Sequence, residues 1–165
     1  MESRERMLQA ERRKPVRFLV QRVSSAEVSV EGDCVGRIGR GFLVFVGISG
    51  TDTAETADRM VKKLIGLRIF RDENGKTNLD LKAVDGSLLL ISQFTLYADC
   101  RKGNRPSFVN AGAPEMANSL YRYIIDKCRG EIAAVEEGSF GADMKVSLTN
   151  DGPFTVILDS DEIMG

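Results

Sequence analysis

Four residues at the end of an apolar run carry side chains that could position a reacting group. Ser92-Gln93-Phe94-Thr95 directly follows the apolar residues 88–91. Polar residues that end a buried strand must find hydrogen-bond partners or face a cavity, because burying them unpaired is costly. The segment is therefore a candidate lining for a reaction site. The alternative is structural, with Ser92 and Thr95 bonded to nearby backbone.

A second candidate segment lies near the end of the chain. Asn150-Asp151-Gly152-Pro153 contains four residues that favour turns, and the hydroxyl-bearing Thr155 follows shortly after. A Gly-Pro peptide can be cis or trans, and the sequence does not decide between the two. On local grounds alone the segment predicts a plain turn between two strands.

Two further segments carry groups that could contact a nucleic acid. Arg101, Lys102 and Arg105 place three cations within five residues, beside a glycine and an asparagine, which suits a phosphate-contacting loop. Phe140-Gly141-Ala142 places an aromatic ring beside small residues, where the ring could stack on a base. The alternatives are a solvated charged loop and a core phenylalanine.

The sequence contains no histidine. This excludes Ser-His-Asp and Cys-His catalysis, the His-Glu-x-x-His zinc site and zinc fingers that use histidine. An enzyme of this composition must use backbone amides, carboxylates, hydroxyls or groups of its own substrate. Because no residue cluster has the spacing of a metal site, we expect no metal and no other cofactor.

The overall composition is that of an ordinary soluble domain, with 165 residues, 42% hydrophobic and 28% charged. A net charge of −1 and a pI of about 5.6 restrict any RNA contact to one patch or one end of the RNA. Three scattered cysteines, Cys34, Cys100 and Cys128, indicate reduced thiols and a cytoplasmic location. No apolar run is long enough to span a bilayer or form a signal core, so we expect neither a membrane partner nor secretion.

Hydrophobic periodicity predicts an α+β fold, a small β-barrel or curled antiparallel-rich sheet with two main helices on one side. One helix is expected at residues 51–66, with Asp52 as the cap. The other has Pro114 in its first turn and Gly130 just past its end. Residues 144–148 and 154–158 both alternate, so they are expected to form a final hairpin around Asn150-Asp151-Gly152-Pro153. The other strands are expected at residues 16–23, 26–30, 34–38, 42–48, 67–70 and 87–96.

Residues 1–15 differ from the rest of the chain. They are crowded with charges and have few apolar residues, which predicts a disordered or loosely helical extension. The ordered pattern begins at Val16, so residues 16–165 are expected to form the one functional domain.

Taken together, four segments resemble D-aminoacyl-tRNA deacylase, also called D-Tyr-tRNA deacylase. Their order and spacing agree with that family from about residue 16 to residue 159. The pair Ser-Gln-x-x-Thr and Asn-x-Gly-Pro-x-Thr is specific in this order. The segments are Val20-Gln21-Arg22-Val23, Ser92-Gln93-Phe94-Thr95-Leu96, Gly138-Ser139-Phe140-Gly141-Ala142 and Asn150-Asp151-Gly152-Pro153-Phe154-Thr155.

The resemblance implies a homodimer with an active site at each end of its interface. In the family, a cis Gly-Pro peptide reaches into the partner's site, which here would be Gly152-Pro153, steadied by Arg22. Asn150 and Thr155 belong to the same motif. The remaining site residues implied are Ser92, Gln93, Phe94 and Thr95 at the reacting ester, and Phe140, Gly141, Ala142 and Met144 around the terminal adenosine.

The activity implied by the resemblance is hydrolysis of the ester between a D-amino acid and tRNA. Glycine mischarged on alanine tRNA would also be cleaved, and L-aminoacyl-tRNA would be rejected. Thr95 could act as a covalent nucleophile, but a threonine hydroxyl is weak without a base to activate it. The family is instead thought to use the 2′-hydroxyl of the RNA to orient a water molecule, while the protein supplies positioning and backbone N–H donors.

Two rival functions remain open at this point. One is a sister editing enzyme with a trans Gly-Pro peptide, which would admit small L-amino acids. The other is a nucleic-acid-binding module that has the fold without the catalysis. The intact motifs and the slightly negative net charge argue against such a binding module.

Overall fold

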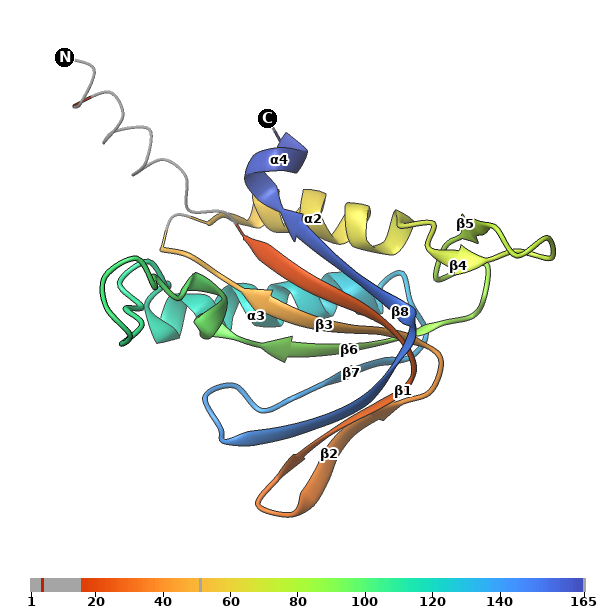
Figure 1. The fold of residues 1–165 in the computed structure, drawn as a ribbon, viewed down its shortest axis with the longest axis horizontal. Coiled ribbons are helices and arrows are strands. Elements are labelled where there is room, and N and C mark those ends of the chain that lie inside the picture. Colours follow the sequence, from red (N-terminus) through yellow and green to blue (C-terminus); the bar gives the residue numbers. More distant parts are fainter. Residues whose placement is uncertain (1–3, 5–15, 51, 165) are drawn as a thin grey trace.

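The longest strand pairing in the fold joins β1 (Arg17–Val30) to β8 (Met144–Asp159). The structure is a computed structural model that describes residue 4, residues 16–50 and residues 52–164. The extension predicted for residues 1–15 therefore lies outside the described residues, apart from Arg4. β1 pairs with β8 from Arg17 to Val30, and both strands bend together (Figure 1).

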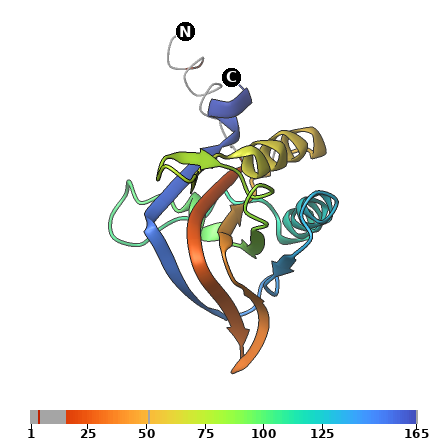
Figure 2. The same cartoon turned by 90° about the vertical axis from the view of Figure 1, so that its right-hand side faces the viewer.

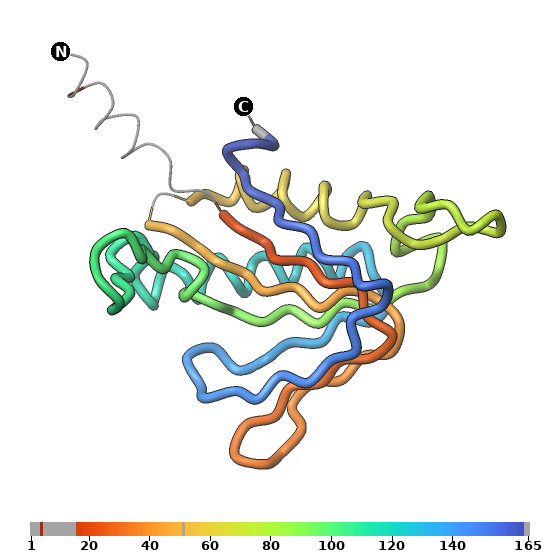
Figure 3. Tube along the Cα trace, viewed as in Figure 1, coloured from red at the N-terminus to blue at the C-terminus, as the bar shows by residue number. Residues whose placement is uncertain are grey.

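The other edge of β1 is shared between two strands. Its first part pairs with β3 (Gly41–Gly47) and its last part with β2 (Asp33–Ile38), both antiparallel. β3 continues through parallel pairing to β6 (Ser87–Ser92), and β6 pairs in parallel with β7 (Val135–Glu137). Because β1 pairs with β3 along its first part and with β2 along its last part, the sheet curls into a partly closed barrel, as the tube in Figure 3 shows.

The two main helices, α2 (Ala54–Gly66) and α3 (Pro114–Arg129), cover one side of the curled sheet (Figure 2). This confirms the predicted fold class. Three small elements complete the fold. They are the two-stranded sheet of β4 (Phe70–Arg71) and β5 (Thr77–Leu79), the 3-10 helix η1 (Phe94–Tyr97), and the terminal helix α4 (Ser160–Met164). In the described part of the chain, no helix is long and apolar enough to cross a membrane.

The central strands β3 and β6 are buried on both faces, which explains their continuous apolar sequences. Phe42, Val44, Leu88 and Leu90 point into the larger core beneath α2 and α3. The alternate residues Leu43, Leu89 and Ile91 point into a smaller core inside the curl, together with Val23 and Val28. The sheet is thus held between two apolar clusters, one on each face.

The hairpin predicted at the end of the chain is wrong. Residues 144–159 form one strand, and both halves run antiparallel to β1. Thr155 pairs with Gln21 and Asn150 pairs with Val23, so residues 151–154 face Arg22 alone. The turn-forming residues make a bulge that interrupts the strand without reversing it. Alternation of apolar residues on each side is the same for a bulged strand and for a hairpin, so it cannot distinguish the two.

Three local predictions also need correction. The first helix is capped by Thr53, whose hydroxyl accepts the Thr56 N–H, while the Asp52 carboxylate accepts the N–H of Ser49. The strand expected at residues 87–96 ends at Ser92, because a 3-10 turn begins at Phe94. The strand expected at residues 67–70 is reduced to the short β4. In each case the segment exists and its boundary moved.

Gly41 is required where β3 approaches β6. A Cβ atom at Gly41 would lie 2.6 Å from the backbone nitrogen of Ser87, a contact that neither strand can relieve without moving. Gly41→Ala should therefore lower the free energy of unfolding by about 3 kcal/mol, the upper end of the cost of overpacking. Urea denaturation measures this value.

Gly39→Ala is the matched control for that substitution. It lies two residues earlier, and a Cβ there would meet nothing within 4 Å. Its effect should stay within about 0.5 kcal/mol, as for other surface substitutions. Equal stability of the two variants would show that the β3–β6 approach does not constrain the fold.

Candidate active site

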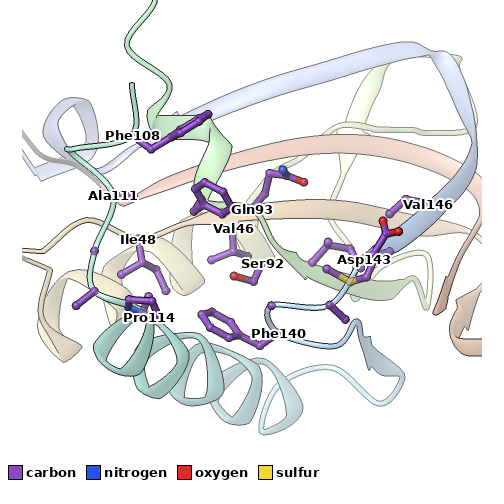
Figure 4. Close-up of a pocket in the computed structure, with 18 residues that line it drawn as sticks. Val46, Ile48, Ser92, Gln93, Phe108, Ala111, Pro114, Phe140, Asp143 and Val146 are labelled. Atoms are coloured by element: carbon purple, nitrogen blue, oxygen red, sulfur yellow. The ribbon is translucent and has the colours of Figure 1, made fainter. Parts of the chain in front are cut away.

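A cavity of about 660 Å³ lies between the end of β6, the start of α3 and the turn that precedes β8. Figure 4 shows the 18 residues that line it, with Ser92 between Phe140 below and Phe108 above. The walls are mostly apolar and carry a few polar groups, as is usual for sites that bind small molecules. The cavity brings together segments that lie far apart in the sequence.

The strand-end segment forms one wall of the cavity. Ser92, Gln93 and Phe94 line it, whereas Thr95 is exposed and does not. The Gln93 side chain donates a hydrogen bond to the Thr95 hydroxyl, so the two polar groups are oriented together. The first hydrogen bond within η1 runs from the Leu96 N–H to the Gln93 carbonyl (3.3 Å). The N–H groups of Phe94 and Thr95 come before this bond, so neither has an acceptor within the 3-10 helix.

Two contacts hold this turn against the sheet. The buried Tyr97 hydroxyl donates to the Gly47 carbonyl (2.9 Å), and Arg17 donates to the Leu96 carbonyl (3.1 Å). The Arg17 guanidinium also lies 5.5 Å from the centre of the Tyr97 ring. Burial raises the pKa of Tyr97 far above its ordinary value, so this phenol stays protonated as a donor.

The opposite wall contains the second group of predicted residues. Phe140, Gly141, Ala142 and Met144 all line the cavity, and their role around the terminal adenosine stays a prediction. The chain turns tightly here, with the Ala142 N–H bonded to the Ser139 carbonyl (3.1 Å) and Gly141 at a φ of 76°. A Cβ at Gly138 would lie 2.6 Å from the Met144 sulfur, so a glycine there lets Met144 reach the wall.

The aromatic ring of this wall rests on α3. Phe140 contacts Tyr121, with ring centroids 6.1 Å apart. The Tyr121 hydroxyl donates to the Leu90 carbonyl at 2.6 Å, which ties α3 to β6. Burial raises the pKa of Tyr121 to about 12, so this link persists across the neutral range. Phe140 thus packs against a tyrosine that is itself held by a buried hydrogen bond.

Sequence reasoning missed the third wall. Phe108 and residues 111–114 line the cavity, although they follow a polar loop. The Gly112 N–H donates to the Ile48 carbonyl (2.9 Å), and Ala111 forms an isolated bridge with Ser49. The available signal was the pair Phe108 and Val109, two apolar residues within an otherwise polar stretch.

The cavity has little capacity for acid–base chemistry. Among the described residues that line it, Asp143 alone is ionisable. Asp143 is mostly exposed and pairs with Lys145 at 3.3 Å. Behind the wall, Asp52 accepts the Ser49 N–H at 2.6 Å, and burial raises the pKa of Asp52 to about 6. The arrangement is therefore suited to positioning a substrate by shape and hydrogen bonds.

The predicted cationic loop lies beside the cavity and does not line it. Arg101 pairs with Asp99 at 2.8 Å, and its hydrogen bonds lower the pKa of Asp99 to about 2. Lys102 and Arg105 are exposed, and no ion pair is found for either among the described residues. Two hydrogen bonds between the backbones of Asp99 and Ser107 close the base of the loop.

The remaining predicted residues form a second cluster, at the bulge of β8. Arg22 is only 3% exposed, and it donates to the Asp151 carbonyl (2.9 Å) and the Ile69 carbonyl (2.6 Å). The Asn150 amide donates to the carbonyls of Arg22 and Phe154 and accepts the Phe154 N–H, at 2.9–3.1 Å. These contacts fasten the start of the bulge to β1 and tie its two ends, Asn150 and Phe154, to each other.

The peptide between Gly152 and Pro153 is cis, and Gly152 has a φ of 130°. A Cβ at Gly152 would lie 2.5 Å from a guanidinium nitrogen of Arg22, so only glycine fits there without displacing Arg22. Thr155 accepts a long hydrogen bond of 3.4 Å from Gln21. None of these residues lines the cavity. In Figure 1 the bend of β8 lies at the right, away from the green segment at the left that contains η1.

Other candidate sites are weak. Cys34 and Cys100 are exposed and Cys128 is buried, and all three are free thiols. Within the described ranges, no group of three or more His, Cys, Asp or Glu side chains is placed to hold a metal ion. The expectation of a cofactor-free protein stays a prediction.

The hydrogen bonds of Asn150 lead to a prediction about the bulge. Asn150→Ala removes all three, so it should lower the free energy of unfolding by about 2 kcal/mol. The Phe154 amide, which loses its acceptor, should exchange hydrogen faster than in the unsubstituted protein. Urea denaturation and amide hydrogen exchange measure the two effects.

Asn104→Ala serves as the control, since Asn104 is exposed in the cationic loop. It should change stability by less than about 0.5 kcal/mol. Unchanged exchange at Phe154 in Asn150→Ala would mean that the Asn150 side chain does not hold the bulge.

Comparison with known proteins gives a consistent result. The family model described as D-Tyr-tRNA(Tyr) deacylase matches residues 19–159. A D-aminoacyl-tRNA deacylase of Clostridium novyi (strain NT) is 57% identical over 145 residues, covering 88% of this chain and 97% of that protein. One of Thermosipho africanus (strain TCF52B) is 49% identical over 148 residues, covering 90% and 99%.

Solved structures agree with the sequence matches. A protein described as c-Myc DNA Unwinding Element Binding Protein is 39% identical with a TM-score of 0.81, covering 86% of this chain and 97% of that chain. A probable eukaryotic D-amino acid tRNA deacylase, 19% identical, has the same fold with a TM-score of 0.78, covering 88% of this chain and 99% of that one. With these matches over most of its length, the chain belongs to the D-Tyr-tRNA(Tyr) deacylase family, as its four motifs predicted.

Proposed function

We propose that this protein hydrolyses the ester of D-aminoacyl-tRNA and releases free tRNA and the D-amino acid. The observation that carries the proposal is the cavity in which the strand end, Ser92 to Phe94, faces Phe140 and Ala142. The same residues were selected from the sequence by their family motifs. The relatives that match most of the chain are named D-aminoacyl-tRNA deacylase.

In this proposal the cavity binds the terminal adenosine of the tRNA. Phe140, Gly141, Ala142 and Met144 form the wall against the nucleoside, and Ser92 and Gln93 lie toward the ester. The cations Arg101, Lys102 and Arg105 contact phosphates of the acceptor end. This local patch suits a chain whose net charge is −1, since only one end of the RNA is bound.

The chemical step relies on positioning by the protein and on the substrate's own hydroxyl. The ribose 2′-hydroxyl beside the ester orients a water molecule for attack on the carbonyl. The N–H groups of Phe94 and Thr95 bind the oxygen that becomes negatively charged, as in an oxyanion hole. The scarcity of ionisable groups along the cavity and the absence of histidine support this mechanism.

Selection of the D-enantiomer is assigned to a second copy of the chain. The bulge with Gly152 and Pro153 does not line the cavity of its own chain, which supports a site that another copy completes. We propose a homodimer in which the carbonyls of Gly152 and Pro153 face the α-carbon of the amino acid. An L-residue would drive its Cβ into these oxygens, whereas glycine and D-residues would not.

A DNA-binding role is the second candidate, because the relative described as c-Myc DNA Unwinding Element Binding Protein has the same fold at 39% identity. A sister deacylase for small L-amino acids is the third. Binding to duplex DNA without deacylation would favour the second, and cleavage of L-Ala-tRNA with D-Tyr-tRNA spared would favour the third.

The decisive test is deacylation of matched tRNA esters by the purified full chain. D-Tyr-tRNA and Gly-tRNA should be cleaved, while L-Tyr-tRNA should react slower by on the order of 100-fold or more. The assay follows release of the labelled amino acid. Similar rates on D-Tyr-tRNA and L-Tyr-tRNA would contradict the proposed selection of the D-enantiomer. A failure to cleave any of the esters would contradict the proposal that the protein is a deacylase.

Substitution of Thr95 distinguishes attack by a water molecule from covalent attack by the threonine hydroxyl. Thr95→Ala should retain activity within about 100-fold, because losing a true nucleophile costs on the order of a million-fold. A D-Tyr-tRNA that ends in 2′-deoxyadenosine should lose far more activity than that variant does. Single-turnover rates give both values. If Thr95→Ala is inactive while the deoxy substrate is cleaved normally, the threonine is the nucleophile.

A further inference from the structure

Two aromatic rings are exposed where the cavity opens to solvent. The Phe94 side chain is 57% exposed and Phe108 is 37% exposed, although both residues line the cavity. Their ring centroids are 5.1 Å apart and their planes meet at 75°, an edge-to-face pair. Val109, beside Phe108, is 79% exposed. The proposed roles of the site use the backbone of Phe94 and leave these ring surfaces unexplained.

The aromatic pair lies next to the positive loop. Residues 99–110 contain Arg101, Lys102 and Arg105 against the single acid Asp99, which gives this segment a formal charge of +2 within a chain of −1. All three cations are exposed. Aromatic faces combined with a track of cations are the features that bind single-stranded nucleic acid, because bases stack on the rings and phosphates pair with the cations.

The backbone holds Phe108 in place before any ligand arrives. Asp99 and Ser107 exchange two hydrogen bonds, of 2.7 and 2.9 Å, immediately before Phe108. The Ala111 N–H donates to the Phe108 carbonyl (3.1 Å), and the Gly112 N–H donates to the carbonyl of Ile48, directly after β3. A residue whose backbone is already fixed in this way loses little backbone entropy on binding.

We propose that Phe108, packed edge-to-face with Phe94, is a stacking platform for the unpaired nucleotide that precedes the terminal adenosine, with Lys102 and Arg105 binding its phosphates. The proposal rests on the proposed function, because it assumes that the cavity holds the terminal nucleoside. A strand that ends in the cavity must leave through its opening, where the exposed rings and the cations lie. The platform would select a single-stranded 3′ end over a blunt duplex.

The test compares two minimal substrates, D-tyrosyl-adenosine and the same ester on the trinucleotide CCA. The protein should cleave the trinucleotide with a kcat/KM about 10-fold higher, mainly through a lower KM, as one stacked base would give. Phe108→Leu, which keeps an apolar side chain but has no π face, should bring this ratio close to one. Phe108→Tyr should keep the ratio, and Val109→Ala, on the exposed neighbour, should change it less than about twofold.

Binding of the uncharged trinucleotide CCA and of adenosine, measured in parallel, tests the platform without any hydrolysis. If the trinucleotide binds tighter than adenosine in a way that needs Phe108, the platform stands even where the esters are not cleaved. If both esters are cleaved equally well, the platform is wrong and the proposed function survives. A change of oligomeric state in Phe108→Leu, seen by light scattering, would overturn the proposal by showing that the rings contact a second copy of the chain.

Discussion

The pairing of β1 with β8 is the constraint on which both candidate clusters depend. One strand, β8, begins at the cavity wall with Met144 and carries the bulge at Gly152 in its middle. Because β1 holds it in register on both sides of the bulge, the wall and the bulge cannot move independently. A hairpin, as the alternation suggested, would have left the two halves free to take different partners. The continuous strand instead pairs both with one strand, β1.

The bulge itself is held by a buried charge. Burying a guanidinium is costly unless its donors are satisfied. Arg22 meets this cost with two carbonyl acceptors, the nearby Asp151 carboxylate and the Phe154 ring, whose centre lies 4.9 Å away. One acceptor belongs to the bulge and the other, Ile69, to the segment after α2, so Arg22 joins three parts of the chain. The same side chain leaves no room for a Cβ at Gly152, which ties the glycine of the motif to the arginine of β1.

The sequence predicted the parts of the structure that depend on local patterns. The two helices and the apolar central strands follow from hydrophobic periodicity. The residues that line two walls of the cavity were selected from the sequence through the family motifs. The third wall, at Phe108 and residues 111–114, escaped notice because its position depends on a hydrogen bond from Gly112 to a distant strand. The direction of the chain after Asn150 could not be read either, since alternation is the same for a strand that continues and for one that returns.

A cavity with few ionisable groups limits how catalysis can occur at this site. A general acid or base of the protein would need a group of suitable pKa within hydrogen-bond reach of the ester. Asp143, the one ionisable side chain among the described residues of the cavity wall, is solvated and paired with a lysine. Thr95 does not line the cavity, and its hydroxyl accepts a hydrogen bond from Gln93, which occupies one of its lone pairs. What the walls do offer is shape, a few polar groups and the Phe140 ring, which packs against Tyr121. Such a site can accelerate a reaction mainly by holding its substrate in a reactive position. This is why the proposed function assigns the activation of water to the 2′-hydroxyl of the RNA and not to a side chain of the protein.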